Sequence, residues 1–81
     1  MNFRTYGALK VMVDAYNKVH RLEKLELWFP HMFADGKWAV DLVFGKHPDL
    51  EPIAPFLSFC LANNLYAYFT NFNGDLAIHI Q

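Results

Sequence analysis

The sequence predicts an α+β fold, a two-layer sandwich in which two helices cover one face of a four-stranded, largely antiparallel sheet. Apolar residues recur with the period of a helix and then alternate with the period of a strand. This succession occurs twice, in the order α-β-β-α-β-β. A glycine lies between the strands of each predicted hairpin, where its tolerance of positive φ suits a tight turn. We therefore expect a single domain spanning residues 1–81.

The two halves of the chain resemble each other, which indicates a tandem αββ repeat. Two segments of the first half align with two of the second, 22–29 and 36–42 with 62–69 and 74–80. The connection between the aligned segments has six residues in the first half and four in the second. The predicted repeat units are residues 5–44 and 52–81.

The composition favours a small cytoplasmic domain with a rich core. A domain of this size buries only about 60% of the surface of its unfolded chain, but 54% of the 81 residues are hydrophobic and 17% aromatic. Seven Lys and Arg against eight Asp and Glu give no strong field of one sign, although residues 1–24 hold five of the seven. Cys60 is the single cysteine, so no disulfide can form within the chain. We see no signal peptide and no apolar run long enough to cross a membrane.

The first predicted helix covers residues 5–21, capped by Asn2 or Thr5. Its apolar positions are spaced by three and four residues, which places them on one face: Tyr6, Leu9, Met12, Val13, Tyr16 and Val19. Charged and amide side chains fall on the other side, with Lys10, Asp14 and Lys18 spaced for ion pairs. We expect an amphipathic helix with a basic outer face.

Two alternating segments after Leu22 predict a first hairpin, with strands at 25–29 and 37–44 joined through Asp35-Gly36. Pro30 lacks the N–H that a paired strand uses. We therefore expect the pairing to loosen there and residues 31–33 to form a bulge or a widened loop.

The second half predicts a connector at 46–49, a helix from about Pro52 to Asn63-Asn64, and strands at 65–71 and 75–80. Proline is tolerated in a first helical turn, and asparagine accepts the left-handed conformation at a helix C-terminus. Asn73-Gly74 is a favoured two-residue hairpin turn. The strand orders that keep neighbours antiparallel and respect the repeat are 2-1-3-4 and 1-2-4-3.

Alternation divides the strand residues between two faces of the sheet. We expect the helices on the side of Leu25, Leu27, Phe29, Val40, Leu65, Ala67, Phe69, Leu76, Ile78 and Ile80. The opposite side would then carry Glu26, Trp28, Ala39, Asp41, Val43, Tyr66, Tyr68, Thr70, Ala77 and His79. One Trp and two Tyr among small residues are typical of a binding surface, because aromatic residues dominate interface hot spots. They are also simply good strand formers. Met32 and Phe33 at the hairpin end favour binding.

Leu57 and Leu61 indicate a possible second interface. They occupy positions of the second helix where the first helix has Asn17 and Arg21, and a helix that is apolar all round is covered on more than one side. Either the segment 45–51 or the first helix covers them, or a partner does, including a second copy of the chain.

Other chemistries have weaker support. Trp28, Tyr66 and Tyr68 could stack the bases of a single-stranded nucleic acid, but Lys37 is the only cation near them, and phosphate neutralisation supplies much of such affinity. The candidate metal ligands show no ligand spacing: His20, His31, His47, His79 and Cys60. Asp41 and His79 are equivalent in the two repeats, and an adjacent carboxylate could orient the imidazole for acid–base catalysis.

The sequence therefore predicts, first, a small non-enzymatic protein-binding module without a cofactor, possible as a homodimer. Its partner-binding residues would be Trp28, Met32, Phe33, Asp41, Tyr66, Tyr68 and His79. Short cysteine-poor chains of this kind are often adaptors or inhibitors, including those that viruses and mobile elements direct against host enzymes. The alternatives are a single-stranded nucleic-acid-binding protein and a small enzyme that uses Asp41 and His79.

Overall fold

The computed structural model describes residues 1–20, 24–32, 38–45 and 50–81. The elements are α1 (Phe3–Val19), β1 (Glu26–Met32), β2 (Trp38–Gly45), α2 (Leu50–Ala62), β3 (Ala67–Phe72) and β4 (Asp75–Ile80). The predicted α+β class and element order are thus confirmed. The predicted Asp35-Gly36 turn, the connector 46–49 and Phe33 lie outside the described residues. Neither helix in the described part of the chain is long and apolar enough to cross a membrane.

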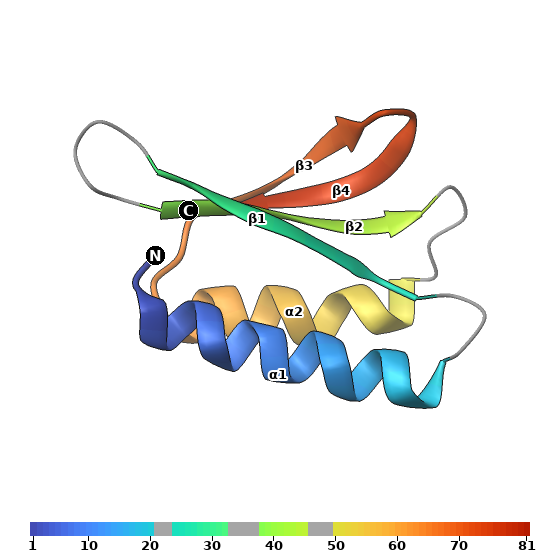
Figure 1. Ribbon diagram of the computed structural model, residues 1–81, viewed down its shortest axis with the longest axis horizontal. Coiled ribbons are helices and arrows are strands. Elements are labelled where there is room, and N and C mark those ends of the chain that lie inside the picture. Colours follow the sequence, from blue (N-terminus) through green and yellow to red (C-terminus); the bar gives the residue numbers. More distant parts are fainter. Residues whose placement is uncertain (21–23, 33–37, 46–49) are drawn as a thin grey trace.

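The four strands form one antiparallel sheet in the order β1-β2-β4-β3, one of the two orders that the sequence predicts. The two hairpins therefore meet through β2 and β4, and β1 and β3 are the outer strands. Figure 1 shows a strongly twisted sheet with both helices on the same side of it. The tandem repeat of the two halves stays a prediction.

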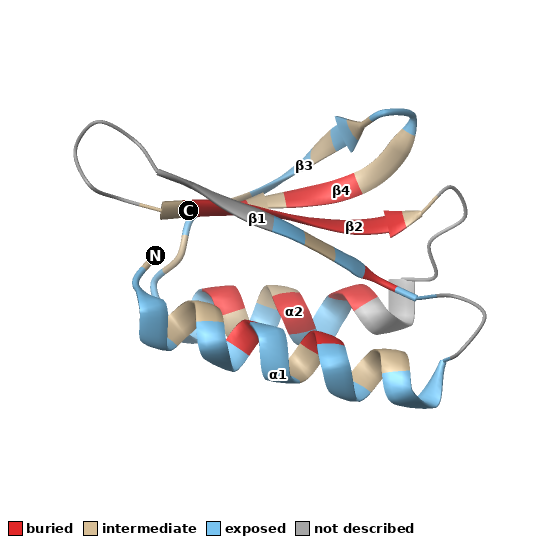
Figure 2. Ribbon diagram, in the orientation of Figure 1, coloured by how far each residue is buried: buried red, intermediate tan, exposed pale blue. Residues whose placement is uncertain are grey.

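The core lies between the helices and the sheet and draws on both helices and the two central strands. Its buried members are Leu9 and Val13 of α1, Ile53, Phe56 and Cys60 of α2, Leu25, and the alternate strand residues Val40, Leu42, Phe44, Ile78 and Ile80. Figure 2 shows the buried residues gathered on β2 and β4 and on the helix surfaces that face them. The period of two along the strands and of three to four along the helices accounts for this selection.

Local hydrogen bonds fix the start of α1 and the end of α2. Asn2 Oδ1 accepts a hydrogen bond from the Thr5 N–H at 2.9 Å, so α1 begins at Phe3, two residues earlier than predicted. At the end of α2, Asn64 adopts a φ of 55°. The Leu65 N–H then reaches the Cys60 carbonyl at 2.9 Å, and the Asn64 N–H reaches the Leu61 carbonyl at 3.3 Å. This Schellman arrangement confirms the predicted helix end.

The β3–β4 hairpin turns through Asn73 and Gly74, whose φ angles of 52° and 90° suit a type I′ turn. The β1–β2 pairing shifts register between Trp28 and His31, which confirms the disturbance expected at Pro30. Pairing then resumes, however, and β1 continues to Met32. The expectation that His31 and Met32 lie in a bulge or a widened loop was therefore wrong for these two residues, because the irregularity lies between Trp28 and His31 and both residues pair with β2.

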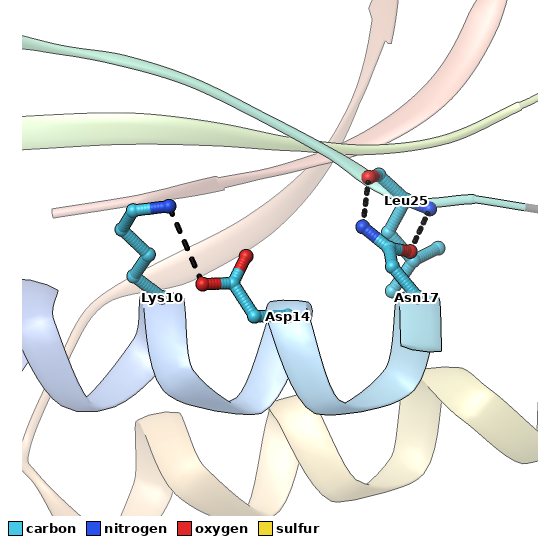
Figure 3. A network of polar contacts seen from close by, with 4 residues as sticks. All are labelled: Lys10, Asp14, Asn17 and Leu25. Atoms are coloured by element: carbon cyan, nitrogen blue, oxygen red, sulfur yellow. Dashed lines mark hydrogen bonds and ion pairs between the residues drawn. The ribbon is translucent and has the colours of Figure 1, made fainter. Parts of the chain in front are cut away.

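Asn17 joins α1 to the start of β1 through two hydrogen bonds. Its Nδ2 donates to the Leu25 carbonyl at 2.9 Å, and its Oδ1 accepts from the Leu25 N–H at 2.7 Å (Figure 3). Lys10 and Asp14, in the two preceding turns of α1, form an exposed ion pair at 3.4 Å. Asn17 is thus a structural link, whereas the sequence placed it on the solvated side of the helix.

Replacing Asn17 by alanine is expected to lower the free energy of unfolding by about 1–3 kcal/mol, because both polar groups of Leu25 lose their partner in a partly buried position. Asp14→Ala, the matched control on the same helix, should change it by less than about 0.5 kcal/mol, since it breaks only an exposed pair. Urea denaturation followed by circular dichroism measures both. Equal effects of the two substitutions would contradict the link.

Candidate functional site

We call the side of the sheet turned away from the core cluster the far face. Residues of β1, β2, β3 and β4 contribute to it alternately, and Tyr66 extends it beyond β3 by exchanging backbone hydrogen bonds with Gln81. Its described members are Glu26, Trp28, Ala39, Asp41, Val43, Tyr66, Tyr68, Thr70, Phe72, Asp75, Ala77 and His79. The far face therefore brings together five of the seven residues that the sequence predicts for partner binding.

The middle of the far face is closed. Ala39, Val43 and Ala77 are buried although they point away from the main core. The rings of Trp28 and Phe72 contact each other with centroids 4.8 Å apart. Because these residues belong to the two outer strands, the contact requires the sheet to curl over its far face. The expectation of an open sheet face was therefore wrong at its centre, where residues of the two central strands are buried and rings from the two outer strands are in contact.

Three large aromatic side chains nevertheless remain accessible on the far face. Trp28 is 43% exposed, Tyr68 44% and Tyr66 62%. The Tyr66 and Tyr68 rings contact each other with centroids 5.6 Å apart, and the Tyr68 ring lies 5.1 Å from that of His79. The indole Nε1 of Trp28 donates to Glu26 Oε2 at 3.2 Å. Neighbours thus hold each accessible ring in place, which lowers the entropy lost when a partner binds.

Asp41 and His79 form a close polar pair on the far face, and both side chains are mostly buried. The strand order makes them direct partners across β2 and β4, and His79 Nδ1 lies 2.9 Å from Asp41 Oδ1. A carboxylate in this position fixes the orientation of the imidazole. The His79 ring also contacts the Tyr68 ring. The pair therefore links the two central strands and supports the Tyr68 ring.

The far face is acidic in the described part of the chain. Glu26, Asp41 and Asp75 contribute carboxylates, and Asp75 Oδ1 is buried with no hydrogen-bond partner among the described residues. The described lysines and arginine lie elsewhere, on α1 and just before β1: Arg4, Lys10, Lys18 and Lys24. Lys37 lies outside the described residues. This distribution disfavours a phosphate backbone as the ligand of the far face.

The candidate metal ligands do not come together in the described part of the chain. Cys60 is buried in the core on the other side of the sheet, and this burial raises the pKa of its thiol. It behaves as a small hydrophobic residue rather than a nucleophile. His20 stacks on Tyr16 at the end of α1. The side chain of His31 and all of His47 lie outside the described residues.

Leu57 and Leu61, the possible second interface, differ in exposure. Leu57 is half-buried and packs against the core, whereas Leu61 is 80% exposed. Neither α1 nor any other described element therefore covers Leu61. Phe69 lies on the helix side of β3, where the alternation places it, but it is 52% exposed, unlike its buried partner Ile78. The strand order explains the difference, because β3 is an outer strand. Met32 pairs with Trp38 at the end of β1.

Comparisons of the chain with protein-family models, with curated proteins and with solved structures found no match.

Proposed function

We propose that the protein is a small non-enzymatic protein-binding module and that its partner docks on the far face. The observation that supports this proposal is the group of accessible aromatic rings, Trp28, Tyr66 and Tyr68, on one side of one sheet. Tyr and Trp bury much area for little lost conformational freedom, and they are enriched among residues that dominate binding energy. An adaptor or an inhibitor of a foreign enzyme would need no more than such a surface.

Charge favours a protein over a nucleic acid as the partner. The far face presents carboxylates and, among its described residues, no Lys or Arg. A nucleic acid would bring phosphates to this surface without counter-charges, whereas a protein can offer apolar and basic side chains. A Lys or Arg of the partner placed over the exposed face of Tyr66 or Tyr68 would gain a cation–π contact as well.

The Asp41–His79 pair is the one feature that favours an enzyme as second candidate, because the 2.9 Å contact holds the imidazole in a fixed orientation. In the proposed module the pair instead positions Tyr68. Once a biological activity of the protein can be measured, the His79→Gln variant distinguishes a catalytic role of the pair from the positioning of Tyr68. If the chain is an enzyme, this substitution abolishes turnover; if it is a binding module, it weakens binding only through Tyr68.

Affinity capture with matched variants tests the proposed function. Immobilised protein is incubated with an extract of the cells that express it, with and without nuclease, and compared with the Tyr68→Ser and Val11→Ser variants. Val11 is exposed on α1, away from the sheet. We expect that the native chain and the Val11→Ser variant both retain a particular protein from the extract, and that the Tyr68→Ser variant does not.

Salt and nuclease distinguish the alternatives in the same experiment. An aromatic protein contact should survive nuclease and change little between 50 and 200 mM salt. A protein that neutralises several phosphates loses about a thousandfold or more in affinity over that range. Retention that requires nucleic acid, or that Tyr68→Ser leaves intact, would contradict the proposal.

A further inference from the structure

At alternate residues, the outer edge of β3 offers backbone groups that have no partner among the residues the structure describes. Tyr66 exchanges both backbone hydrogen bonds with Gln81, at 3.0 and 2.8 Å, so these residues form a hydrogen-bonded pair. Antiparallel pairs alternate between hydrogen-bonded and non-hydrogen-bonded. Tyr68, Thr70 and Phe72 therefore bond to β4, while the residues between them direct their N–H and C=O groups outward: Ala67, Phe69 and Asn71.

The two outer strands of the sheet differ in how well they are protected against the addition of a further strand. β1 contains Pro30 and a shift of register, both of which disfavour the addition of another strand. β3 pairs with β4 without any shift, and it contains no proline, no glycine and no charged residue. Natural proteins usually block an edge of this kind. An unblocked, regular, uncharged edge is suited to accept a strand.

The side chains along this edge are self-complementary. A two-fold axis at Phe69 would place Phe69 opposite its own copy and Ala67 opposite Asn71 of the other chain. These are the residues whose backbone groups point outward, so each strand would satisfy the groups of the other. The exposed Phe69 ring would be covered by its counterpart, and the absence of charge removes any repulsion between identical strands.

We propose that β3 pairs antiparallel with β3 of a second copy of this chain, centred on Phe69, and joins the two sheets into one. The partner is a second copy of the chain, because a two-fold axis at Phe69 pairs each outward N–H and C=O group from Ala67 to Asn71 with a group of the identical strand. No strand of a different sequence is needed. The pairing would place the two far faces side by side, so that Tyr66 and Tyr68 of both copies lie on one continuous surface. This inference does not rest on the proposed function, since it concerns the backbone edge rather than the far face.

Solution mass tests the pairing, measured by size-exclusion chromatography with light scattering over a wide concentration range. We expect the mass of two chains at high concentration and of one chain on dilution. Phe69→Lys should raise the dimer dissociation constant about a hundredfold, because it places like charges opposite each other. Leu61→Lys is the matched control: it puts the same charge on another exposed apolar residue, on α2, and should leave the constant unchanged.

If the Phe69→Lys variant fails to fold, a second variant, Ala67→Pro, and amide hydrogen exchange in the native protein still test the strand pairing. Proline at 67 removes an outward N–H that β4 does not use, so the monomer should fold while the dimer weakens. In the native protein, the amides of Phe69 and Asn71 should exchange rapidly when dilute and slowly when concentrated. A native chain that stays monomeric at every concentration, or a dimer that Leu61→Lys disrupts and Phe69→Lys spares, would overturn the proposal.

Discussion

Replacing Ile78 by alanine is expected to lower the free energy of unfolding by about 2–5 kcal/mol. Ile78 is fully buried in the middle of the sheet, where it pairs with Leu42 of β2 and Phe69 of β3. Its truncation loses transfer free energy and leaves a cavity that the neighbouring strands cannot fill by moving. A domain of this length has a total stability of about 4–12 kcal/mol, so the variant would be partly unfolded at room temperature in the lower part of that range.

Urea denaturation followed by far-ultraviolet circular dichroism measures the effect of Ile78→Ala. Ile78→Val should cost only about 0.5–1.5 kcal/mol, because it removes one methyl group. Val11→Ala at an exposed position of α1 should change the stability by less than about 0.5 kcal/mol. A cost below about 1 kcal/mol for Ile78→Ala would show that Ile78 does not lie in the core as described.

Trp28→Ala is expected to destabilise the fold by about 2 kcal/mol, although Trp28 is 43% exposed. Its ring contacts that of Phe72 from the opposite outer strand. Removing it exposes apolar surface of the Phe72 ring and frees the two edges of the curled sheet. The free energy of unfolding in urea is the quantity to measure, and Phe72→Ala should behave similarly.

Tyr66→Ala is the matched control for Trp28→Ala, because it removes another aromatic ring from the same face. Tyr66 is more exposed, and its one described ring contact is with Tyr68. We expect a change in stability of less than about 0.5 kcal/mol. If Trp28→Ala were as mild as Tyr66→Ala, the far face would be open and the sheet would not be held in its curl by the aromatic contact.

This contrast assigns different roles to residues that the sequence grouped together. Trp28 belongs in part to the fold, and Asp41 and His79 are mostly buried and paired with each other. Tyr66 and Tyr68 are 62% and 44% exposed, and neither takes part in the ring contact between the two outer strands. Mutations at the two tyrosines should therefore report on partner binding, whereas mutations at the other three residues also report on stability.

Periodicity and turn chemistry were enough to predict the number and order of the helices and strands that the structure describes, but not every strand end. The alternation of apolar residues predicted the strands, Asn73-Gly74 predicted a turn, and Asn63-Asn64 predicted the end of α2. These features depend on neighbouring residues, whose spacing is visible in the sequence. The pairing of Asp41 with His79 could be predicted only on the condition that β2 and β4 are neighbours in the sheet.

Features that depend on distant parts of the chain could not be predicted in the same way. The contact between Trp28 and Phe72 arises from the accumulated twist of four strands, which no local pattern encodes. The exposure of Phe69 depends on β3 being outermost, and alternation alone gives a buried and an exposed strand the same pattern. The continuation of β1 beyond Pro30 depends on how the pairing absorbs one shifted residue.

The most direct test of the far face as a binding surface is a nuclear magnetic resonance titration of the isotope-labelled protein with the captured partner. We expect the largest chemical-shift changes at Trp28, Tyr66, Tyr68 and His79, with little change along the exposed side of α1. Changes concentrated on that side of α1, or around Leu61 on α2, would contradict the account and place the binding surface on the helical layer.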